Sequence, residues 1–423
     1  MTIFKFENSE AFALGLDQKD SLRSWRESFF VPQHKGHDLI YLCGNSLGLQ
    51  PRKSAFFLEK EQKTWQNHGV EGWFEGTEPW LDYHAFCKNT LAAITGALPD
   101  EVCPMNSLTV NMHLVLTSFY QPNPDKFKIL SIGGDFPSDQ YALETHLKTR
   151  GYDPAQALLE VCPRPDEHLI RNADILLMIE KNANTLAMVW LSGVHYYTGQ
   201  LYDLATIAKK CTDLGITIGL DLAHAVGNVP LKLHEWGVDC AVWCSYKYLN
   251  AGPGGVAGLF VHEKHHASNL PRLAGWWGYD QPTRFEMTKG FVPMNGADGW
   301  QISTPNVLSL AVQRGALGAF EAVGMEQLRN KSVALTGFLA FILADFKHSI
   351  EIITPQNPHQ RGSQLSLLVE KNGKACFEFL LQNGIVGDWR EPNCIRLAPT
   401  SLYNSFREVW QVGQVLQKYF KTQ

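Results

Sequence analysis

The sequence predicts an α/β protein. We expect a large domain with a mostly parallel sheet between helices, and a smaller α+β domain at the C-terminal end. Between about residues 100 and 265, short apolar runs rich in β-forming side chains alternate with amphipathic stretches. After about residue 305 this alternation stops, and helical and strand patterns are mixed. The 423 residues are 45% hydrophobic and 19% charged, which suits a folded chain with a sizeable core.

Five apolar runs are the predicted strands of the large sheet. They are Lys128–Ile132, Ala187–Leu191, Ile216–Leu220, Ala241–Cys244 and Val256–Val261. A helix is expected before the third run, because four apolar residues recur there at i, i+3, i+4 and i+7. These residues are Leu204, Ile207, Ala208 and Cys211.

The C-terminal part begins with a predicted helix over Val307–Val323. Two strands and two helices are expected to follow, near Gln364–Val369, Ile395–Leu397, Lys374–Asn383 and Ser405–Phe420. We therefore expect three segments: 1–65, which contributes to the small domain and to the active site; 66–310, the large ligand-binding domain; and 311–423, the small domain.

Charge and cysteine usage argue against several classes of function. The 37 basic and 42 acidic residues give a net charge of −5, so neither nucleic acid nor an anionic membrane is expected as a partner. There is no apolar run of about 18 residues, and the first twenty residues do not resemble a signal peptide. The nine cysteines lack CxxC and zinc-finger spacing, which predicts buried reduced thiols, no metal site and a cytoplasmic protein.

Two predicted strand ends carry the most informative side chains. The third run ends at Asp221, and Lys247 follows the fourth. Open α/β sheets bind ligands beyond the carboxyl ends of their strands. A desolvated lysine can attack a carbonyl, and a carboxylate can keep a ring nitrogen protonated. The pair, followed by the Gly-rich turn 251–255, is the minimal equipment for pyridoxal 5′-phosphate (PLP) chemistry. As structural alternatives, the aspartate would cap a helix and the lysine would be a surface charge.

Three further features would complete such a site, and each has a structural alternative. The helix start at Leu108 and Thr109 could bind a phosphate, or it could be an ordinary capped terminus. Phe136 could stack on a pyridine ring, or belong to the core. Arg396, flanked by apolar residues, could bind a substrate carboxylate, or pair with a structural acid.

Taken together, these segments closely resemble the kynureninases, which are fold type I PLP enzymes of the aspartate aminotransferase superfamily. The similar segments are YLCGNSLGLQP (41–51), MNSLTVNMHL (105–114), FPSDQYALE (136–144), SGVHYYTGQ (192–200), DLAHAVGNVPL (221–231), WCSYKYLNAGPGG (243–255), GWWG (275–278), ISTP (302–305) and IRLAPTSLYNS (395–405). The resemblance covers nearly the whole chain and implies a seven-stranded sheet in a PLP-dependent transferase-like fold.

The resemblance assigns roles to individual residues. Lys247 would form the Schiff base, Asp221 would pair with the pyridine nitrogen, and Tyr246 would bind phosphate and transfer protons. The other expected cofactor-binding residues are Leu108, Thr109, Phe136, Pro137, Ser138, Asp139, Ser192, His224, Trp276 and Thr304. The expected substrate-binding residues are Ser46, Trp73, Thr304 and Arg396.

The activity implied is hydrolysis of L-kynurenine, or of 3-hydroxykynurenine, to L-alanine and anthranilate or its 3-hydroxy form, in tryptophan catabolism or NAD biosynthesis. Trp276 and Thr304 would reach the site of a partner subunit, which implies a homodimer. Family members that prefer 3-hydroxykynurenine carry His and Asn where this chain has Trp73 and Thr304.

The alternative interpretation is a class V aminotransferase or cysteine desulfurase. A desulfurase needs a cysteine on a mobile loop, and no cysteine stands in a clear Gly/Ser-rich loop. A non-catalytic relative would be expected to lack the lysine or the carboxylate clamp, and this chain has both.

Overall fold

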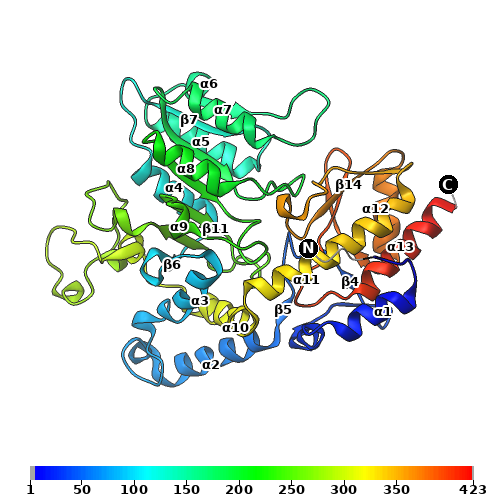
Figure 1. Cartoon of the computed structure of the whole chain (residues 1–423). Coiled ribbons are helices and arrows are strands. Elements are labelled where there is room, and N and C mark those ends of the chain that lie inside the picture. Colours follow the sequence, from blue (N-terminus) through cyan, green and yellow to red (C-terminus); the bar gives the residue numbers. More distant parts are fainter. Residues whose placement is uncertain (1–4, 422–423) are drawn as a thin grey trace.

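A seven-stranded, mostly parallel sheet forms the centre of the larger part of the molecule (Figure 1). The computed structural model describes residues 5–421. In order across the sheet, the strands are β6 (Val102–Pro104), β12 (Gly258–Val261), β11 (Cys240–Trp243), β10 (Thr217–Asp221), β9 (Leu186–Ser192), β7 (Lys128–Ile132) and β8 (Leu158–Val161). Of the seven strands, β12 alone runs in the direction opposite to the other six. The sheet is therefore mostly parallel, and the predicted α/β fold is confirmed.

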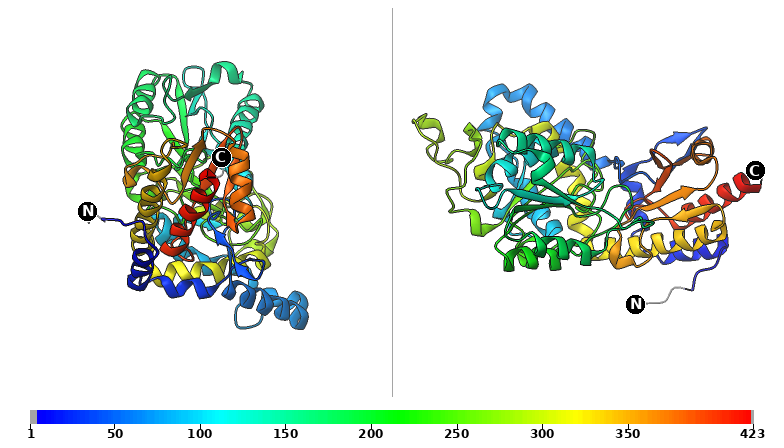
Figure 2. Two further views of the ribbon diagram at one scale, coloured as in Figure 1. Left: turned by 90° about the vertical axis from the view of Figure 1, so that its right-hand side faces the viewer. Right: turned by 90° about the horizontal axis from the view of Figure 1, so that it is seen from above.

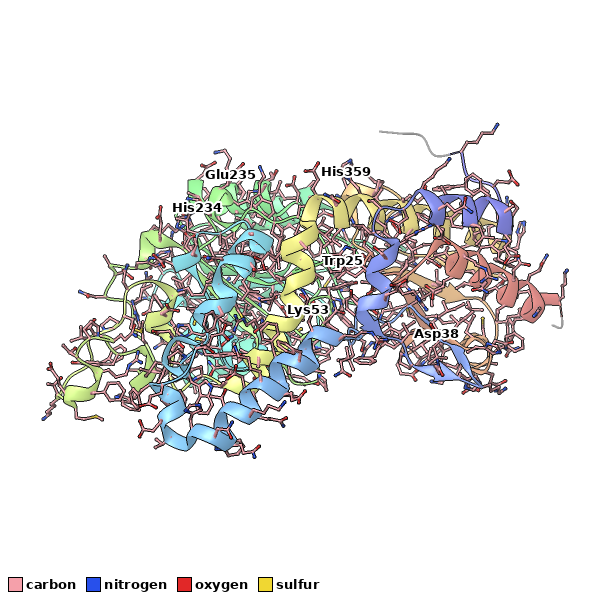
Figure 3. All side chains as sticks on the ribbon, turned by 90° about the horizontal axis from the view of Figure 1, so that it is seen from below. Trp25, Asp38, Lys53, His234, Glu235 and His359 are labelled. Atoms are coloured by element: carbon pink, nitrogen blue, oxygen red, sulfur yellow. The ribbon has the colours of Figure 1, made fainter. Side chains whose placement is uncertain are left out.

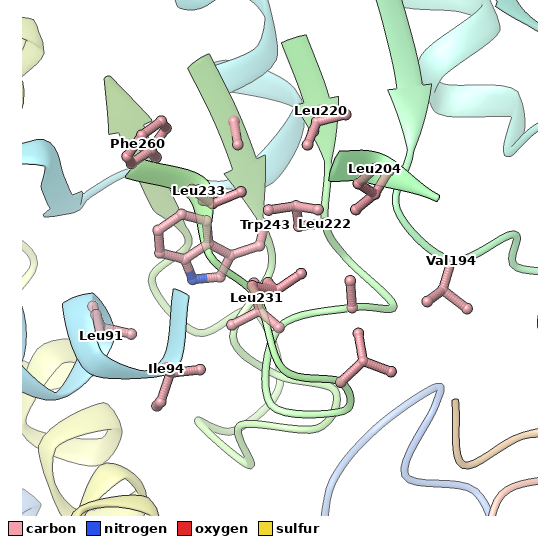
Figure 4. Close-up of a cluster of buried hydrophobic side chains, with 14 of the residues drawn as sticks. Leu91, Ile94, Val194, Leu204, Leu220, Leu222, Leu231, Leu233, Trp243 and Phe260 are labelled. Atoms are coloured by element: carbon pink, nitrogen blue, oxygen red, sulfur yellow. The ribbon is translucent and has the colours of Figure 1, made fainter. Parts of the chain in front are cut away.

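Helices cover both faces of this sheet, as Figure 2 shows from two sides. The helices of this part are α2 (Arg52–His68), α3 (Ala85–Thr95), α4 (Leu108–Phe119), α5 (Pro137–Thr149), α6 (Pro154–Ala157), α7 (Asn172–Lys181), α8 (Leu204–Asp213), α9 (Leu233–Trp236) and α10 (Val307–Val323). Alternate residues of β9 enter two separate cores: Val189 packs in one and Trp190 in the other. The first core also holds Trp243 of β11 and Leu91 of α3 (Figure 4). Burial on both faces explains why the strands are continuously apolar.

Helix α10 joins the larger part to the smaller one and lies beside α2 (Figure 3, where Lys53 marks α2). The two helices approach closely at Gly315. A Cβ atom on Gly315 would stand 2.5 Å from the backbone of Ser54, so a larger residue would push the helices apart. Ser54 also donates a hydrogen bond of 2.7 Å to the carbonyl of Val312. Residues 311–323 therefore pack with the core of the large sheet.

The smaller part is built on a four-stranded antiparallel sheet. Its strands, in order, are β13 (Ile350–Ile352), β14 (Leu365–Val369), β17 (Cys394–Leu397) and β16 (Asp388–Arg390). Its helices are α11 (Met325–Leu343), α12 (Gly373–Gln382) and α13 (Phe406–Lys421), joined by α1 (Glu10–Lys19) from the N-terminal segment. The predicted strands and helices of this part are found within about two residues, whereas α11, β13 and β16 were not predicted.

The N-terminal segment threads between the two parts. Strand β4 (Ile40–Tyr41) pairs in parallel with β15 (Ile385–Val386) of the smaller part. Strand β1 (Phe29–Phe30) pairs with β5 (Gln50–Pro51), and β2 (Gln33–His34) pairs with β3 (His37–Asp38). Gly48 then donates its N–H to the carbonyl of Tyr246 at 2.8 Å. This segment thus connects the smaller part with the loop after β11.

All nine cysteines lie in the described part of the chain and are free. Eight are buried, as predicted, but Cys162 is exposed, so the prediction of burial is wrong for that residue. Cys162 directly follows β8, which is the edge strand of the sheet, and lies in a loop. Among residues 5–421, no helix has the length and hydropathy needed to cross a membrane.

Candidate active site

Two neighbouring parallel strands bring Asp221 and Lys247 to one edge of the sheet. Asp221 is the last residue of β10 and pairs in register with Val242 of β11. Lys247 lies four residues beyond the end of β11. Both side chains line the same pocket. The predicted placement at adjacent strand ends is therefore found.

Asp221 is 6% exposed, and its Oδ1 accepts a hydrogen bond of 2.7 Å from the N–H of Ala223. Burial raises the pKa of Asp221 to about 6, against the lowering effects of that N–H group and of Lys247. Asp139 lies beside it, and Trp190 donates to Asp139 Oδ1 at 3.1 Å. Burial and the charge of Asp221 raise the pKa of Asp139 well above its usual range. Two buried carboxyl groups with raised pKa values form a site that favours a bound cation.

His224 lies beside the lysine in the same pocket. Its Nε2 is 2.9 Å from Lys247 Nζ. Burial, followed by the charge of Lys247, lowers the pKa of His224 well below its usual range, so the imidazole is neutral. A neutral ring with Nε2 unprotonated accepts the hydrogen bond from the lysine. Its other nitrogen, Nδ1, is buried and has no hydrogen-bond partner.

The start of helix α4 opens into the same pocket through Leu108 and Thr109. Ser107 occupies the N-cap position, but its side chain makes no capping hydrogen bond. The alternative of an ordinary side-chain cap is therefore wrong. Thr109 Oγ1 and Ser138 Oγ lie 2.8 Å apart at the pocket wall. Uncapped N–H groups with two hydroxyls suit an anion such as phosphate.

Phe136 lines the pocket and is 39% exposed, so the alternative that it belongs to the core is wrong. Lys247 Nζ lies 5.8 Å from the centre of its ring. Tyr196 packs edge-on against the same ring at 5.3 Å. The free face of the phenyl group is therefore available to a flat ligand.

Arg396 is fully buried on β17. Its Nη1 donates to the carbonyl of Tyr196 at 2.6 Å, and its Nη2 lies 2.7 Å from Asp388 Oδ2. Arg396 therefore has a structural acidic partner, Asp388, as the alternative interpretation predicted. Arg396 also acts on the site electrostatically, since its charge lowers the pKa of His224 after the larger effects of burial and Lys247.

The structure brings together ten of the predicted residues and leaves six outside the pocket lining. The ten are Leu108, Thr109, Phe136, Ser138, Asp139, Ser192, Asp221, His224, Tyr246 and Lys247. The six are Ser46, Trp73, Pro137, Trp276, Thr304 and Arg396. Pro137 is the first residue of α5, and Ser46 lies in the turn before Gly48.

Trp73, Trp276 and Thr304 lie elsewhere in the structure. Trp73 packs against Trp80 and Trp277, with ring centres 5.6 and 5.5 Å away. Trp276 is 43% exposed and donates to the carbonyl of Arg284 at 3.3 Å. Thr304 is exposed.

Four lining residues were not predicted: Asp135, Val194, Tyr196 and Ala223. Asp135 is buried three residues after β7, and its Oδ1 accepts the N–H of Phe136 at 2.9 Å. The strand-end argument that identified Asp221 applies equally to the residues after β7 and β9. Applied there, it would have found Asp135 and Tyr196.

One further group of side chains has donor atoms close enough to hold a metal ion. Glu101, His234 and His262 have donor atoms within 4.8 Å of one another, and Figure 3 labels His234. Glu101 Oε1 already accepts from His234 Nδ1 at 2.9 Å and from the N–H of Glu263 at 2.8 Å. Internal hydrogen bonds thus account for the arrangement, and we assign no metal to it.

The pocket fits PLP on observations of its own atoms. Three buried polar atoms in its wall lack hydrogen-bond partners: Asp139 Oδ2, Ser192 Oγ and His224 Nδ1. Buried polar groups in proteins are normally paired, so these atoms indicate a polar ligand. The uncapped start of α4 suits a phosphate, and Asp221 suits a protonated ring nitrogen.

Comparison of structures agrees with the fold. A cysteine desulfurase from Thermococcus onnurineus superposes with a TM-score of 0.77 at 16% identity, covering 91% of this chain and 95% of the other. The C-DES mutant K223A, which carries glycine covalently linked to its PLP cofactor, superposes with a TM-score of 0.74 at 17% identity, covering 89% and 96%. At these identities the likeness establishes the fold alone.

Comparison of sequences establishes the family. The kynureninase from Flavobacterium psychrophilum is 47% identical over 418 residues, covering 98% of both chains. The kynureninases from Koribacter versatilis and Myxococcus xanthus are 46% and 47% identical, also over 98% of both chains. Residues 328–416 match the kynureninase C-terminal domain. This chain, with its lysine and aspartate at neighbouring strand ends, therefore belongs to the kynureninase family.

Proposed function

We propose that this chain is a PLP-dependent hydrolase that cleaves L-kynurenine to anthranilate and L-alanine, and 3-hydroxykynurenine to the corresponding products. The observation that supports this proposal most strongly is the geometry around Lys247. Its Nζ lies 2.9 Å from a neutral His224, in a pocket that also contains the buried carboxyl group of Asp221. Near full-length similarity to kynureninases supports this substrate over those of a desulfurase or a class V aminotransferase.

The residues that would hold the cofactor follow from the pocket. Lys247 would hold its aldehyde carbon, and Asp221 its ring nitrogen. Leu108 and Thr109 at the start of α4, with Ser138 and Tyr246, would bind the phosphate. Phe136 would cover one face of the ring, and Asp139, Ser192 and His224 would line its edge. When bound, PLP supplies an electron sink that weakens bonds at the α- and β-carbons of an amino acid.

Lys247 would remove the proton from the α-carbon, since an amine freed from the cofactor is a base. His224 supports this role because its neutral Nε2 accepts a hydrogen bond from Nζ across 2.9 Å, which orients the amine. Arg396 would orient the substrate by its α-carboxylate. Ser46, in the turn beside the Tyr246 carbonyl, would line the substrate space.

Tyr246 would donate a proton where water adds to the γ-carbonyl of the substrate. Burial, followed by the neighbouring Cys244, raises the pKa of Tyr246, so its hydroxyl keeps its proton at neutral pH. A protonated hydroxyl can donate a hydrogen bond to a developing oxyanion. Trp73 would stack on the aniline ring, and with Thr304 it favours kynurenine over its 3-hydroxy form.

We also propose a homodimer in which Trp276 and Thr304 serve the partner's site. The exposure of both residues, and their absence from the pocket of their own chain, support this arrangement. The same segment of the chain holds five other exposed apolar residues, of which Phe285 contacts Trp276: Leu273, Phe285, Met287, Phe291 and Val292. Such a patch marks a protein interface. We further propose a cytoplasmic enzyme of tryptophan breakdown, with a place in NAD biosynthesis as a second possibility.

The dimer is tested by mixing inactive variants. Lys247→Ala and Trp276→Ala subunits are unfolded together, refolded and assayed. A shared site predicts that the mixture regains part of the wild-type activity, because hybrid dimers contain one intact site. No gain over the separate variants would contradict a shared site.

The function is tested with Lys247→Ala, using Lys209→Ala as the control. Lys209 forms an exposed ion pair with Asp213. The wild type and the control should show the visible absorbance of bound PLP and release fluorescent anthranilate from kynurenine, and Lys247→Ala should lose both. Full turnover by Lys247→Ala would refute the assignment. Sulfide release from L-cysteine, without turnover of kynurenine, would favour the desulfurase alternative.

A further inference from the structure

Two arginines share one carboxylate at the edge of the small-domain sheet. Strands β16 and β17 pair in register so that Asp388 stands opposite Arg396, and Arg390 is two residues further along β16. Asp388 is 9% exposed and Arg396 is fully buried. Cross-strand neighbours of opposite charge hold each other in place. The register of this hairpin therefore decides where the guanidinium of Arg396 lies.

The contacts of Asp388 reach both guanidinium groups. Its Oδ1 accepts from Arg396 Nε at 3.2 Å and lies 2.9 Å from Arg390 Nε. Its Oδ2 lies 2.7 Å from Arg396 Nη2 and accepts from Arg390 Nη2 at 3.0 Å. One carboxylate thus fixes one edge of each of the two planar groups.

The donors of Arg396 are not all used. A guanidinium has five N–H groups. Asp388 takes Nε, and the carbonyl of Tyr196 takes one N–H of Nη1 at 2.6 Å. The contact of Nη2 with Asp388 is close, but its angle is not that of a hydrogen bond, and Nη2 is buried without an acceptor. The edge formed by Nη1 and Nη2 therefore retains donors for another acceptor, such as a second carboxylate.

The charges of this group are also unbalanced. Two guanidiniums and one carboxylate leave an excess of one positive charge. This charge acts on the pocket: Arg390 and Arg396 both lower the pKa of His224, after burial and Lys247. Burial raises the pKa of Tyr196, and the charges of Arg390 and Arg396 partly offset that effect. The side chain of Arg390 is 34% exposed, and an excess charge that is only partly solvated favours an anionic partner.

We propose that Asp388 is the positioning residue of a two-arginine carboxylate clamp, in which Arg390 is the second cation. Asp388 holds the side edge of Arg396 so that its Nη1 and Nη2 face the substrate's α-carboxylate. It also leaves one net positive charge to pair with that anion. This inference rests on the proposed function, because it takes the substrate to be an amino acid. Asp388 does not touch the substrate, and it acts through Arg396.

The test is Asp388→Asn in the PLP-loaded enzyme. The side chain keeps its size but loses the charge and one acceptor oxygen. Affinities for L-alanine and for L-alaninamide, which lacks the carboxylate, are measured by calorimetry and by the change in cofactor absorbance. The Kd for L-alanine should rise at least about tenfold, as expected when a charge-assisted fork loses its orientation. The Kd for L-alaninamide should change by less than about twofold.

Steady-state kinetics supply the second readout. The KM for kynurenine should rise with the Kd for L-alanine, whereas kcat should change by less than about threefold, because the lost contact acts equally before and during reaction. If Asp388→Asn does not fold, Asp388→Glu gives the same test. It keeps the charge but moves the carboxylate by one methylene, and it should also weaken binding of L-alanine selectively.

Asp174→Asn is the matched control. Arg164 holds Asp174 in a similar fork, at 2.9 and 2.7 Å, in an exposed position on α7. This variant should bind both ligands as the wild type does. Unchanged or tighter binding of L-alanine by Asp388→Asn would overturn the inference, as would an equal loss for both ligands. A wild type that neither binds L-alanine nor cleaves kynurenine would instead overturn the proposed function.

Discussion

Replacing Asp221 by Asn should stabilise the protein freed of its cofactor while it damages catalysis. Burial raises the pKa of Asp221 from 3.8 to about 6. At about 1.4 kcal/mol per pH unit, a charged Asp221 then costs the folded state about 3 kcal/mol near pH 8. The sign follows from the raised pKa. The cost is absent below about pH 4, grows as the pH rises to about 6, and is constant above that.

The assay is urea unfolding of cofactor-free wild type and Asp221→Asn at pH 5 and pH 8. The variant should gain up to about 3 kcal/mol at pH 8 and clearly less at pH 5, because the amide carries no charge to desolvate. Asp139 is expected to add to this gain in stability, since after burial the charge of Asp221 is the next cause that raises the pKa of Asp139. A loss of stability at pH 8, or a gain independent of pH, would refute the reasoning.

Asp298→Asn is the matched control, because Asp298 is equally buried but has the opposite shift. Burial raises its pKa, yet His84 and Lys88 outweigh that effect and lower the pKa to about 2. Lys88 Nζ lies 2.6 Å from Asp298 Oδ2. The stability that this carboxylate contributes is present above about pH 4 and is lost as the pH falls towards 2. The control should therefore lose about 2 kcal/mol at pH 8.

Three further variants test other parts of the structure. Gly48→Ala would place a Cβ 2.4 Å from the carbonyl oxygen of Lys247, so kcat should fall at least about tenfold, while thermal unfolding shows a folded protein. Glu78→Gln breaks a two-bond fork to Arg314, which is the main reason that the Glu78 pKa is lowered to about 2. Urea unfolding at pH 7 should register a loss of about 2 kcal/mol, which shrinks as the pH is lowered below 4. His224→Phe removes the acceptor of Lys247 Nζ, so single-turnover rates should fall about tenfold or more, while the absorbance of bound PLP persists.

The sequence was most informative where one physical signal dominates. The five predicted strands are buried on both faces, so their apolar runs stand out, and all five occur in the sheet. Strands β6 and β8 were missed because neither shows a clear run of apolar residues. Pro104 ends β6, and β8 at the sheet edge mixes apolar residues with Glu160. Helix α11 was missed although ten of its residues are buried, because three of the ten, Lys331, Ser332 and Thr336, are polar and interrupt the apolar pattern.

The site was predictable to the extent that strand ends determine it. Asp221, His224 and Lys247 follow two neighbouring strands, and topology alone brings them together. The environment of Arg396 was not predictable, because its partner Asp388 depends on the register of a hairpin with an unpredicted strand. The positions of Trp276 and Thr304 in a shared site depend on a second chain, so no pattern within one sequence predicts which pocket they enter.

The pairing of β4 with β15 has a consequence for the order of synthesis and folding. Tyr41 pairs with Val386, which is made 345 residues later in the chain. At about 5 to 20 residues per second, the ribosome needs between about 17 and 70 seconds to supply the second strand. Until then, Ala13 and Leu42 lack the neighbours that cover them. Both side chains are fully buried in the folded protein. This segment is therefore made long before its partner strand, and it stays exposed to misfolding and proteases until that strand is made.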